Sequence, residues 1–99
     1  MAKYKLTNKA VADLSKIWEY TYGVWSEKQA DKYYDILISN CQEIADNPDL
    51  GKIYNGISKQ LLGVKVNKHI IFYRTINESY IEITRILHER MDLKKRIVE

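Results

Sequence analysis

Apolar residues recur at two different spacings along the chain, and the change of spacing separates a helical part from a strand-forming part. Residues 3–7 alternate around Tyr4 and Leu6, which predicts a short first strand. The spacing then becomes helical, and Thr7 or Asn8 can cap the helix because their side-chain oxygens accept a first-turn amide. The predicted apolar stripe of this helix consists of Val11, Leu14, Trp18, Tyr22 and Trp25.

Polar residues and helix stop signals complete a predicted helical hairpin. Asp13, Lys16 and Glu19 are expected on the face opposite the stripe, and Gly23 fits the C-cap because glycine accepts positive φ. Ser26 and Gln29 have capping-box spacing, so a second helix is expected from there to Asn47-Pro48, where proline disfavours helical backbone before it. The short connection between the two helices predicts an antiparallel pair.

Strand periodicity follows from Gln60 onward, after a loop over residues 48–58. Three strands are predicted at about residues 60–66, 69–75 and 80–87, with turns at Asn67-Lys68 and at residues 77–79. On the last strand the alternation predicts one face made of Ile81, Ile83, Arg85 and Leu87. Residues 92–98 fit either a short terminal helix or a frayed tail.

This order of elements predicts one α+β domain over residues 1–99. It has an N-terminal strand, an antiparallel helical hairpin and a three-strand antiparallel meander, with the helices packed on one sheet face. The middle strand is apolar on both faces, so the second sheet face also needs a cover. Either the terminal segment or a partner could provide it, because an open apolar patch is unusual in a monomer.

Charge is distributed unevenly along the 99 residues, whose formal net charge is only +3. Residues 8–49 hold four lysines and eight acids, whereas residues 50–77 hold five cations and no acid. Such a separation indicates a partner that is acidic somewhere. We do not expect direct nucleic-acid binding, because the basic stretch has one arginine and few aromatic residues for stacking.

Several classes of protein are not expected from the composition. Cys41 is the only cysteine, no apolar run approaches a membrane span, and the first residues lack the apolar core of a signal peptide, so we expect a cytoplasmic protein. Two histidines and one cysteine without metal spacing predict no metal site, and scattered glycines predict no phosphate loop, so no cofactor is expected. Cys41 lies in the apolar stripe of the second helix, where a buried structural thiol is expected.

The strongest candidate chemistry lies just past the last strand, at His88, Arg90 and Asp92, with Arg85 near the strand end. Functional side chains favour such places, where a rigid sheet holds a loop. The competing interpretation is an ion-paired cluster that anchors the tail. Arg85 lies on an apolar face, where a charge must be paired, so pairing within the fold is expected for it.

Three segments resemble a known family. The first is Tyr4-Lys-Leu-Thr7 with Ala12-Asp-Leu14 and Ile17-Trp-Glu-Tyr20, and the second is the strand His69-Ile-Ile-Phe-Tyr-Arg74. The third and most specific is Ile83-Thr-Arg-Ile-Leu-His-Glu-Arg-Met-Asp92. All three are similar to ParE-type toxins of the RelE/ParE superfamily. The resemblance covers nearly the whole chain in the correct order. It implies the toxin of a bacterial type II toxin–antitoxin module.

The resemblance implies a toxin that inhibits DNA gyrase by binding rather than by catalysis. It also implies a ParD-like antitoxin, a ribbon-helix-helix dimer whose acidic C-terminal segment wraps the toxin. On this basis the target-binding residues are expected to be Arg85, His88, Arg90 and Met91. The antitoxin-binding residues are expected to be Trp25, Lys59, Lys65 and Arg74.

The alternative is a RelE-like, ribosome-dependent mRNA endoribonuclease. RelE-type toxins use basic residues with an acid or base near the C-terminus, and His88 could serve here with Arg85 and Lys65 on phosphates. Gyrase inhibition is favoured because no convincing catalytic set is present. The glycine-arginine pair that often precedes the second strand in this superfamily is replaced by Gly56-Ile-Ser-Lys59, so Lys59 would have to substitute.

Overall fold

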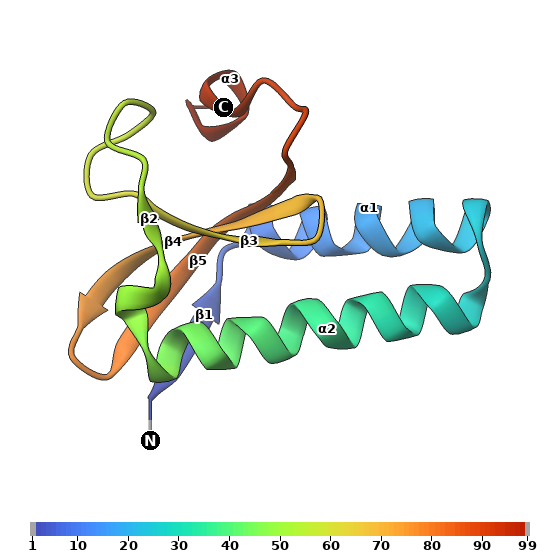
Figure 1. Cartoon of the computed structure of the whole chain (residues 1–99), viewed down its shortest axis with the longest axis horizontal. Coiled ribbons are helices and arrows are strands. Elements are labelled where there is room, and N and C mark those ends of the chain that lie inside the picture. The colour runs from blue at the N-terminus through green and yellow to red at the C-terminus, as the bar shows by residue number, and fades with distance from the viewer. Residues whose placement is uncertain (1, 99) are drawn as a thin grey trace.

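A computed structural model describes residues 2–98 of the chain. A layer of two helices lies against one face of a twisted sheet, and a short helix lies at the far end of the sheet (Figure 1). The elements are β1 (Lys3–Leu6), α1 (Asn8–Val24), α2 (Glu27–Asp46), the 3₁₀ turn η1 (Pro48–Leu50), β2 (Lys52–Ile53), β3 (Leu62–Val66), β4 (His69–Asn77), β5 (Tyr80–His88) and α3 (Leu93–Val98). No helix in the described part is long and apolar enough to cross a membrane.

The five strands form one sheet in the order β1-β5-β4-β3-β2. The predicted meander is confirmed: β3, β4 and β5 pair antiparallel, with Asn67 at φ 54° in the turn between β3 and β4. β1 adds to β5 in parallel, which the long intervening segment from α1 to β4 allows. The two-residue β2 adds a short edge strand in the segment predicted as loop.

The helical hairpin begins where the sequence predicts. Thr7 caps α1 by accepting the Ala10 amide at 3.1 Å, and Ser26 caps α2 by accepting the Gln29 amide at 3.1 Å. The core between the hairpin and the sheet is made of Ala10, Leu14, Leu37, Cys41, Ile44, Ala45, Val66, Ile71, Tyr73, Ile81, Ile83 and Ile86. Gly23 is not the C-cap, since α1 continues to Val24 with Trp25 at the cap position.

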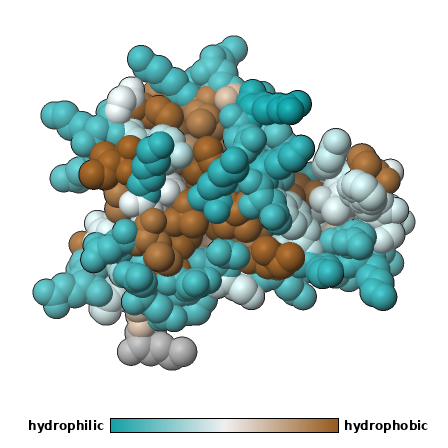
Figure 2. All heavy atoms as spheres, viewed as in Figure 1, coloured by the Kyte–Doolittle hydropathy of each residue, from teal (hydrophilic) through white to brown (hydrophobic). Residues whose placement is uncertain are grey.

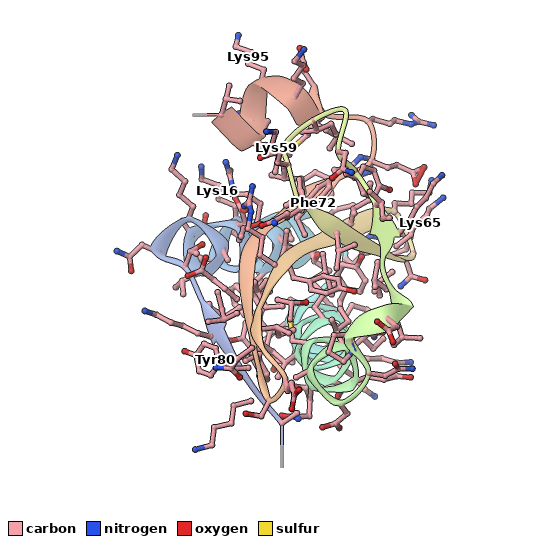
Figure 3. The ribbon with its side chains drawn as sticks, turned by 90° about the vertical axis from the view of Figure 1, so that its left-hand side faces the viewer. Lys16, Lys59, Lys65, Phe72, Tyr80 and Lys95 are labelled. Atoms are coloured by element: carbon pink, nitrogen blue, oxygen red, sulfur yellow. The ribbon has the colours of Figure 1, made fainter. Side chains whose placement is uncertain are left out.

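The other sheet face, here called the outer face, has a smaller core of its own. Leu61, Ile70, Phe72 and Leu87 are buried there beneath four partly buried side chains, Tyr54, Ile57, Leu93 and Ile97. Figure 3 shows Phe72 at the end of the sheet that lies beneath α3 and the loop carrying Lys59. The terminal segment, which is helical, therefore covers this part of the sheet together with the 54–61 loop. On the face of the molecule seen in Figure 2, hydrophilic side chains divide the apolar area into patches.

The predicted apolar stripe of α1 is wrong in detail. Val11, Tyr22 and Trp25 are exposed, whereas Asp13, expected on the solvent side, is buried. Trp18 and Tyr22 stack on one another at 5.3 Å, and the Trp18 indole donates to Asp31 of α2, so these aromatic rings cover the hairpin rather than enter the core. The buried stripe instead contains Ala10, Asp13 and Leu14.

A bulge in β5 explains why the predicted face of that strand is also wrong. The register with β4 shifts between Phe72 and Tyr73, so Phe72 pairs with Arg85 but Tyr73 pairs with Ile83. Ile81 and Ile83 therefore pack against the helices, whereas Leu87 packs into the core of the outer face. Thr84 is the extra residue, and its hydroxyl donates to the Phe72 carbonyl at 3.3 Å.

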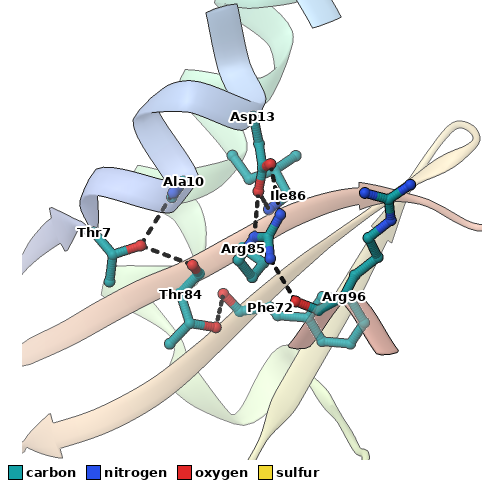
Figure 4. A network of polar contacts seen from close by, with 8 residues as sticks. All are labelled: Thr7, Ala10, Asp13, Phe72, Thr84, Arg85, Ile86 and Arg96. Carbon is teal, nitrogen blue, oxygen red and sulfur yellow. Dashed lines mark hydrogen bonds and ion pairs between the residues drawn. The ribbon is translucent and has the colours of Figure 1, made fainter. Parts of the chain in front are cut away.

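β5 extends beyond the end of β1, so its edge needs other hydrogen-bond partners there (Figure 4). Thr7 donates from its hydroxyl to the Thr84 carbonyl at 2.7 Å, and the Asp13 carboxylate accepts the Ile86 amide at 3.0 Å. Asp13 also accepts two hydrogen bonds from the Arg85 guanidinium, at 2.8 and 3.0 Å. Arg85 in turn donates to the Arg96 carbonyl of α3 at 2.6 Å, so one side chain joins α1, β5 and α3.

The Tyr73 hydroxyl joins β4 to the turn after α2. It donates to the Pro48 carbonyl at 2.6 Å and accepts the Gly51 amide at 2.8 Å. A side chain at Gly51 would collide with this hydroxyl, so glycine is needed there. Burial is the main cause that raises the pKa of Tyr73, which keeps the hydroxyl protonated and able to donate.

Replacing Tyr73 with Phe should therefore lower the free energy of unfolding by about 1–3 kcal/mol, because two partly buried backbone groups lose their partner. Urea unfolding followed by tryptophan fluorescence measures this change. Tyr34→Phe, a change at a partly exposed tyrosine of α2, is the matched control and should have little effect. Equal stability of both variants would show that the Tyr73 hydrogen bonds do not hold the turn.

Candidate protein-binding groove

A groove of about 1040 Å³ lies between the helical hairpin and the end of the sheet where β3 turns into β4. One wall comes from α1 and α2, and the other comes from the β3–β4 turn, the end of β5 and the segment after it. The residues that line this groove are Asp13, Lys16, Ile17, Tyr20, Thr21, Trp25, Gln29, Tyr33, Asn67, Lys68, His69, Ile86, His88, Arg90 and Met91.

The groove combines apolar walls with an excess of positive charge among its lining residues. Tyr20 and Trp25 are 71% and 74% exposed, so the hairpin wall presents large aromatic surface to solvent. Three permanent cations lie along the groove, Lys16, Lys68 and Arg90. The one carboxylate among the lining residues, Asp13, is already bound to Arg85. A ligand with both apolar and anionic groups would therefore be complementary to this surface.

Two histidines and a tyrosine meet at the sheet side of the groove. His69 and His88 are opposite one another in the β4–β5 register, with ring centroids 5.3 Å apart. The Tyr33 hydroxyl and His69 Nδ1 share a hydrogen bond of 2.6 Å. The Arg90 amide donates to His88 Nδ1 at 3.1 Å, so the neutral His88 ring carries its proton on Nε2. Burial, followed by the neighbouring His88, lowers the pKa of His69 to about 4.

Comparison with known proteins identifies the family of this chain. Residues 4–93 match the model of the ParE toxin of the type II toxin–antitoxin system parDE. The chain belongs to the ParE toxin family. Toxin ParE1 of Mycobacterium tuberculosis is 32% identical over 96 residues, covering 97% of this chain and 98% of that protein. Toxin ParE1 of Caulobacter vibrioides is 30% identical over 97 residues, covering 98% and 99%.

A solved structure supports the fold of this ParE-family chain. It is described as the chromosomal ParDE toxin–antitoxin system from P. aeruginosa, and it matches with a TM-score of 0.76. The match covers 89% of this chain and 96% of that chain at 19% sequence identity. The α+β architecture with two helices on one sheet face is therefore shared with that chain.

The groove brings together residues that the sequence assigns to two separate surfaces of a ParE-type toxin. His88, Arg90 and Met91, expected at the target-facing end, line it together with Trp25, expected to bind the antitoxin. Sequence reasoning missed Tyr33 and His69, because the contact between α2 and the β3–β4 turn joins residues 36 positions apart.

The remaining predicted residues lie outside the groove. The Arg85 side chain is 11% exposed and is held by Asp13, so the predicted pairing within the fold is found. Lys65 forms an ion pair with Glu89 at 2.9 Å, which is the main cause that lowers the pKa of Glu89. Arg74 donates to the Ser58 hydroxyl and the Lys59 carbonyl on the outer face.

The structure gives no sign of reactive or metal-binding chemistry elsewhere among the described residues. Cys41 is fully buried, and burial raises the pKa of its thiol to about 12, so the nucleophilic thiolate is suppressed. Within residues 2–98, no group of three or more potential ligands among His, Cys, Asp and Glu is arranged to hold a metal ion.

The low pKa of His69 predicts a specific pH dependence of stability. The pKa of His69 falls from 6.5 to about 4 on folding. Between these pH values the imidazole therefore binds a proton in the unfolded chain but not in the folded chain. The free energy of unfolding should therefore decrease between pH 6.5 and 4, by on the order of 1–2 kcal/mol after allowance for solvent screening.

The His69→Gln variant isolates this contribution, because other acids also titrate in this range. Its stability should depend less steeply on pH than that of the wild type between pH 6.5 and 4, and the two curves should run parallel above pH 7. Chemical unfolding at half-unit pH steps provides the comparison. Parallel curves over the whole range would contradict a depressed His69 pKa.

Proposed function

We propose that this protein is the toxin of a type II toxin–antitoxin module and inhibits DNA gyrase by binding it. The groove carries the proposal, since its aromatic walls and its excess of cations suit a protein ligand. Membership of the ParE family supports the toxin–antitoxin role. The choice of gyrase rests on the resemblance to ParE-type toxins, and we propose the bacterial cytoplasm, where gyrase acts, as the site of action.

The positions of the charged residues favour binding over catalysis. In the mRNA-cleaving alternative, His88 would act together with Arg85 and Lys65. Arg85 forms an ion pair with Asp13, and Lys65 forms one with Glu89. Of these three residues, only His88 lines the groove. A general acid or base needs partners that converge on the reacting phosphate, and this set does not converge.

The same groove is the proposed docking site of a ParD-like antitoxin. An acidic, partly apolar segment of the antitoxin could place carboxylates near Lys16, Lys68 and Arg90 and apolar side chains against Trp25 and its neighbours. Because the groove also contains the expected target-binding residues, an antitoxin bound there would exclude the target. Neutralisation would then be a competition for one surface.

Purified protein should inhibit gyrase supercoiling and leave ribosome-bound mRNA intact. Relaxed plasmid assayed with gyrase and ATP measures the first activity, and primer extension on translated mRNA measures the second. Adding the antitoxin before gyrase should restore supercoiling. Cleavage of mRNA without an effect on gyrase would overturn the proposal in favour of the endoribonuclease.

Replacing Trp25 with Ala should weaken antitoxin binding by at least about tenfold, because exposed tryptophans at protein interfaces often carry a large share of the affinity. The free energy of unfolding should change by less than about 0.5 kcal/mol, since the ring is mostly exposed. Ile53→Ala, on the distant β2 edge and 65% exposed, is the control and should bind normally. Calorimetry with the antitoxin gives the affinities, and equal binding by both variants would place the antitoxin elsewhere.

Arg90→Glu tests the competition between target and antitoxin. The Arg90 side chain is exposed and lines the groove, so charge reversal should reduce both gyrase inhibition and antitoxin affinity while leaving the melting temperature nearly unchanged. Growth arrest on induction, gyrase inhibition and calorimetry provide the readouts. Loss of only one of the two interactions would show that target and antitoxin use separate surfaces.

A further inference from the structure

The uncovered part of the outer face is basic. On β1, Tyr4 and Leu6 pack toward the helices, so Lys3 and Lys5, which alternate with them, lie on the outer face. The strand register places Lys5 beside Glu82, and Glu82 beside Arg74. This row therefore carries more positive than negative charge across three neighbouring strands.

A small hollow of about 360 Å³ continues this basic surface between the start of α1, the sheet and α3. It is lined by Thr7, Asn8, Lys9, Arg74, Thr84, Arg85 and Ile97. Arg74 donates through Nη2 to Ser58 and to the Lys59 carbonyl, and within residues 2–98 it has no carboxylate partner in a salt bridge. The same holds for Lys9, which is exposed.

Two more lysines extend the surface beyond the hollow. Figure 3 shows Lys59 and Lys95 at the α3 end of the molecule. Lys59 is tied to Arg74 through its carbonyl, and Lys95 belongs to α3, the helix that contributes Ile97 to the hollow. The acids of the helical hairpin lie on a different layer, where Glu27, Asp31, Asp35, Glu43 and Asp46 of α2 are exposed.

We propose that this basic outer face, made of Lys3, Lys5, Lys9, Lys59, Arg74 and Lys95, binds the phosphodiester backbone of the DNA that gyrase holds. The inference rests on the proposed function for its setting and assigns a second ligand to the toxin, separate from the protein bound in the groove. This proposal departs from the sequence-based expectation of no direct nucleic-acid binding, which considered only the basic stretch of residues 50–77 and not the lysines of β1, α1 and α3. In free solution the contact is weak, because a few lysines without base-reading groups give salt-sensitive binding.

The chemistry of the two surfaces distinguishes their ligands. A protein interface needs an apolar centre with aromatic anchors, and the aromatic side chains that are more than half exposed, Tyr20, Tyr22 and Trp25, all lie on the helical hairpin. Binding of a nucleic-acid backbone needs cations and polar groups without an apolar centre. Cations with threonine and asparagine groups at the hollow meet that requirement.

The test is charge reversal at Lys9, which lines the hollow, and at Lys95 of α3, in Lys9→Glu/Lys95→Glu. The matched control is Lys28→Glu/Lys32→Glu, which makes the same change in net charge on α2, with Lys28 in the first turn of α2 as Lys9 is in α1. Lys9→Gln/Lys95→Gln is a milder pair in case the reversed pair unfolds. Three quantities are measured for each: gyrase inhibition, antitoxin affinity, and binding to a short DNA duplex by fluorescence anisotropy at low salt.

We expect the Lys9/Lys95 reversal to raise the concentration needed for gyrase inhibition by about tenfold or more and to leave antitoxin affinity unchanged. The slope of log affinity for duplex against log salt should fall by about 2, one for each lost phosphate contact. The control pair should behave like the wild type. The glutamine pair should show the same pattern with a smaller loss.

Each other result overturns the inference in a distinguishable way. Gyrase inhibition unaffected by the Lys9/Lys95 changes leaves the proposed function intact and removes the DNA contact. Loss of antitoxin affinity would assign the outer face to a protein instead. If the wild type does not inhibit gyrase, the proposed function fails, but the duplex measurement still tests the outer face. If the wild type does not bind the duplex at low salt, the outer face is not a DNA-binding site.

Discussion

The structure depends on how the edge of β5 is completed after β1 ends. β1 pairs with β5 only as far as Ile83, and an unpaired strand edge next to a helix would leave buried backbone groups without partners. Asp13 supplies an acceptor for the Ile86 amide and binds Arg85 at the same time. One carboxylate thereby fixes the position of α1 against the end of the sheet.

This arrangement determines where the groove lies. Asp13 and Ile86 both line it, so the contact that positions α1 also sets one wall against the other. Arg85 carries the same restraint to the outer face through the Arg96 carbonyl of α3. The groove and the cover of the outer core are therefore linked through a single guanidinium, and the two surfaces that we assign to protein and to DNA share one structural support.

Most of the fold could be predicted from the sequence, because local signals specify it. Thr7, Ser26, Pro48 and Asn67 act on neighbouring backbone, and the elements begin or end near them. The errors arose where a distant contact overrides the pattern. The helical pattern predicts Asp13 on the solvent side of α1, but Asp13 is paired with Arg85, which is 72 positions away. The bulge at Thr84 reverses the strand alternation that predicts Arg85 on an apolar face.

The candidate site was predicted only in part, for a related reason. The signature near residue 88 lies on one side of the groove and Trp25 on the other, but no local pattern indicates that they face each other. Helical spacing places Tyr22 on the predicted core stripe of α1, although its side chain is exposed. Periodicity reports which residues share a helix face, and the sheet determines which face is buried.

The fold depends on Arg85 and Asp13 acting as a unit. A double-mutant cycle on the free energy of unfolding, with Asp13→Asn and Arg85→Met, tests it most directly. Each single change should lower the free energy of unfolding by about 3–5 kcal/mol by breaking a buried ion pair, and the double variant should cost less than the sum by more than about 2 kcal/mol. Additivity within about 0.5 kcal/mol would contradict the account.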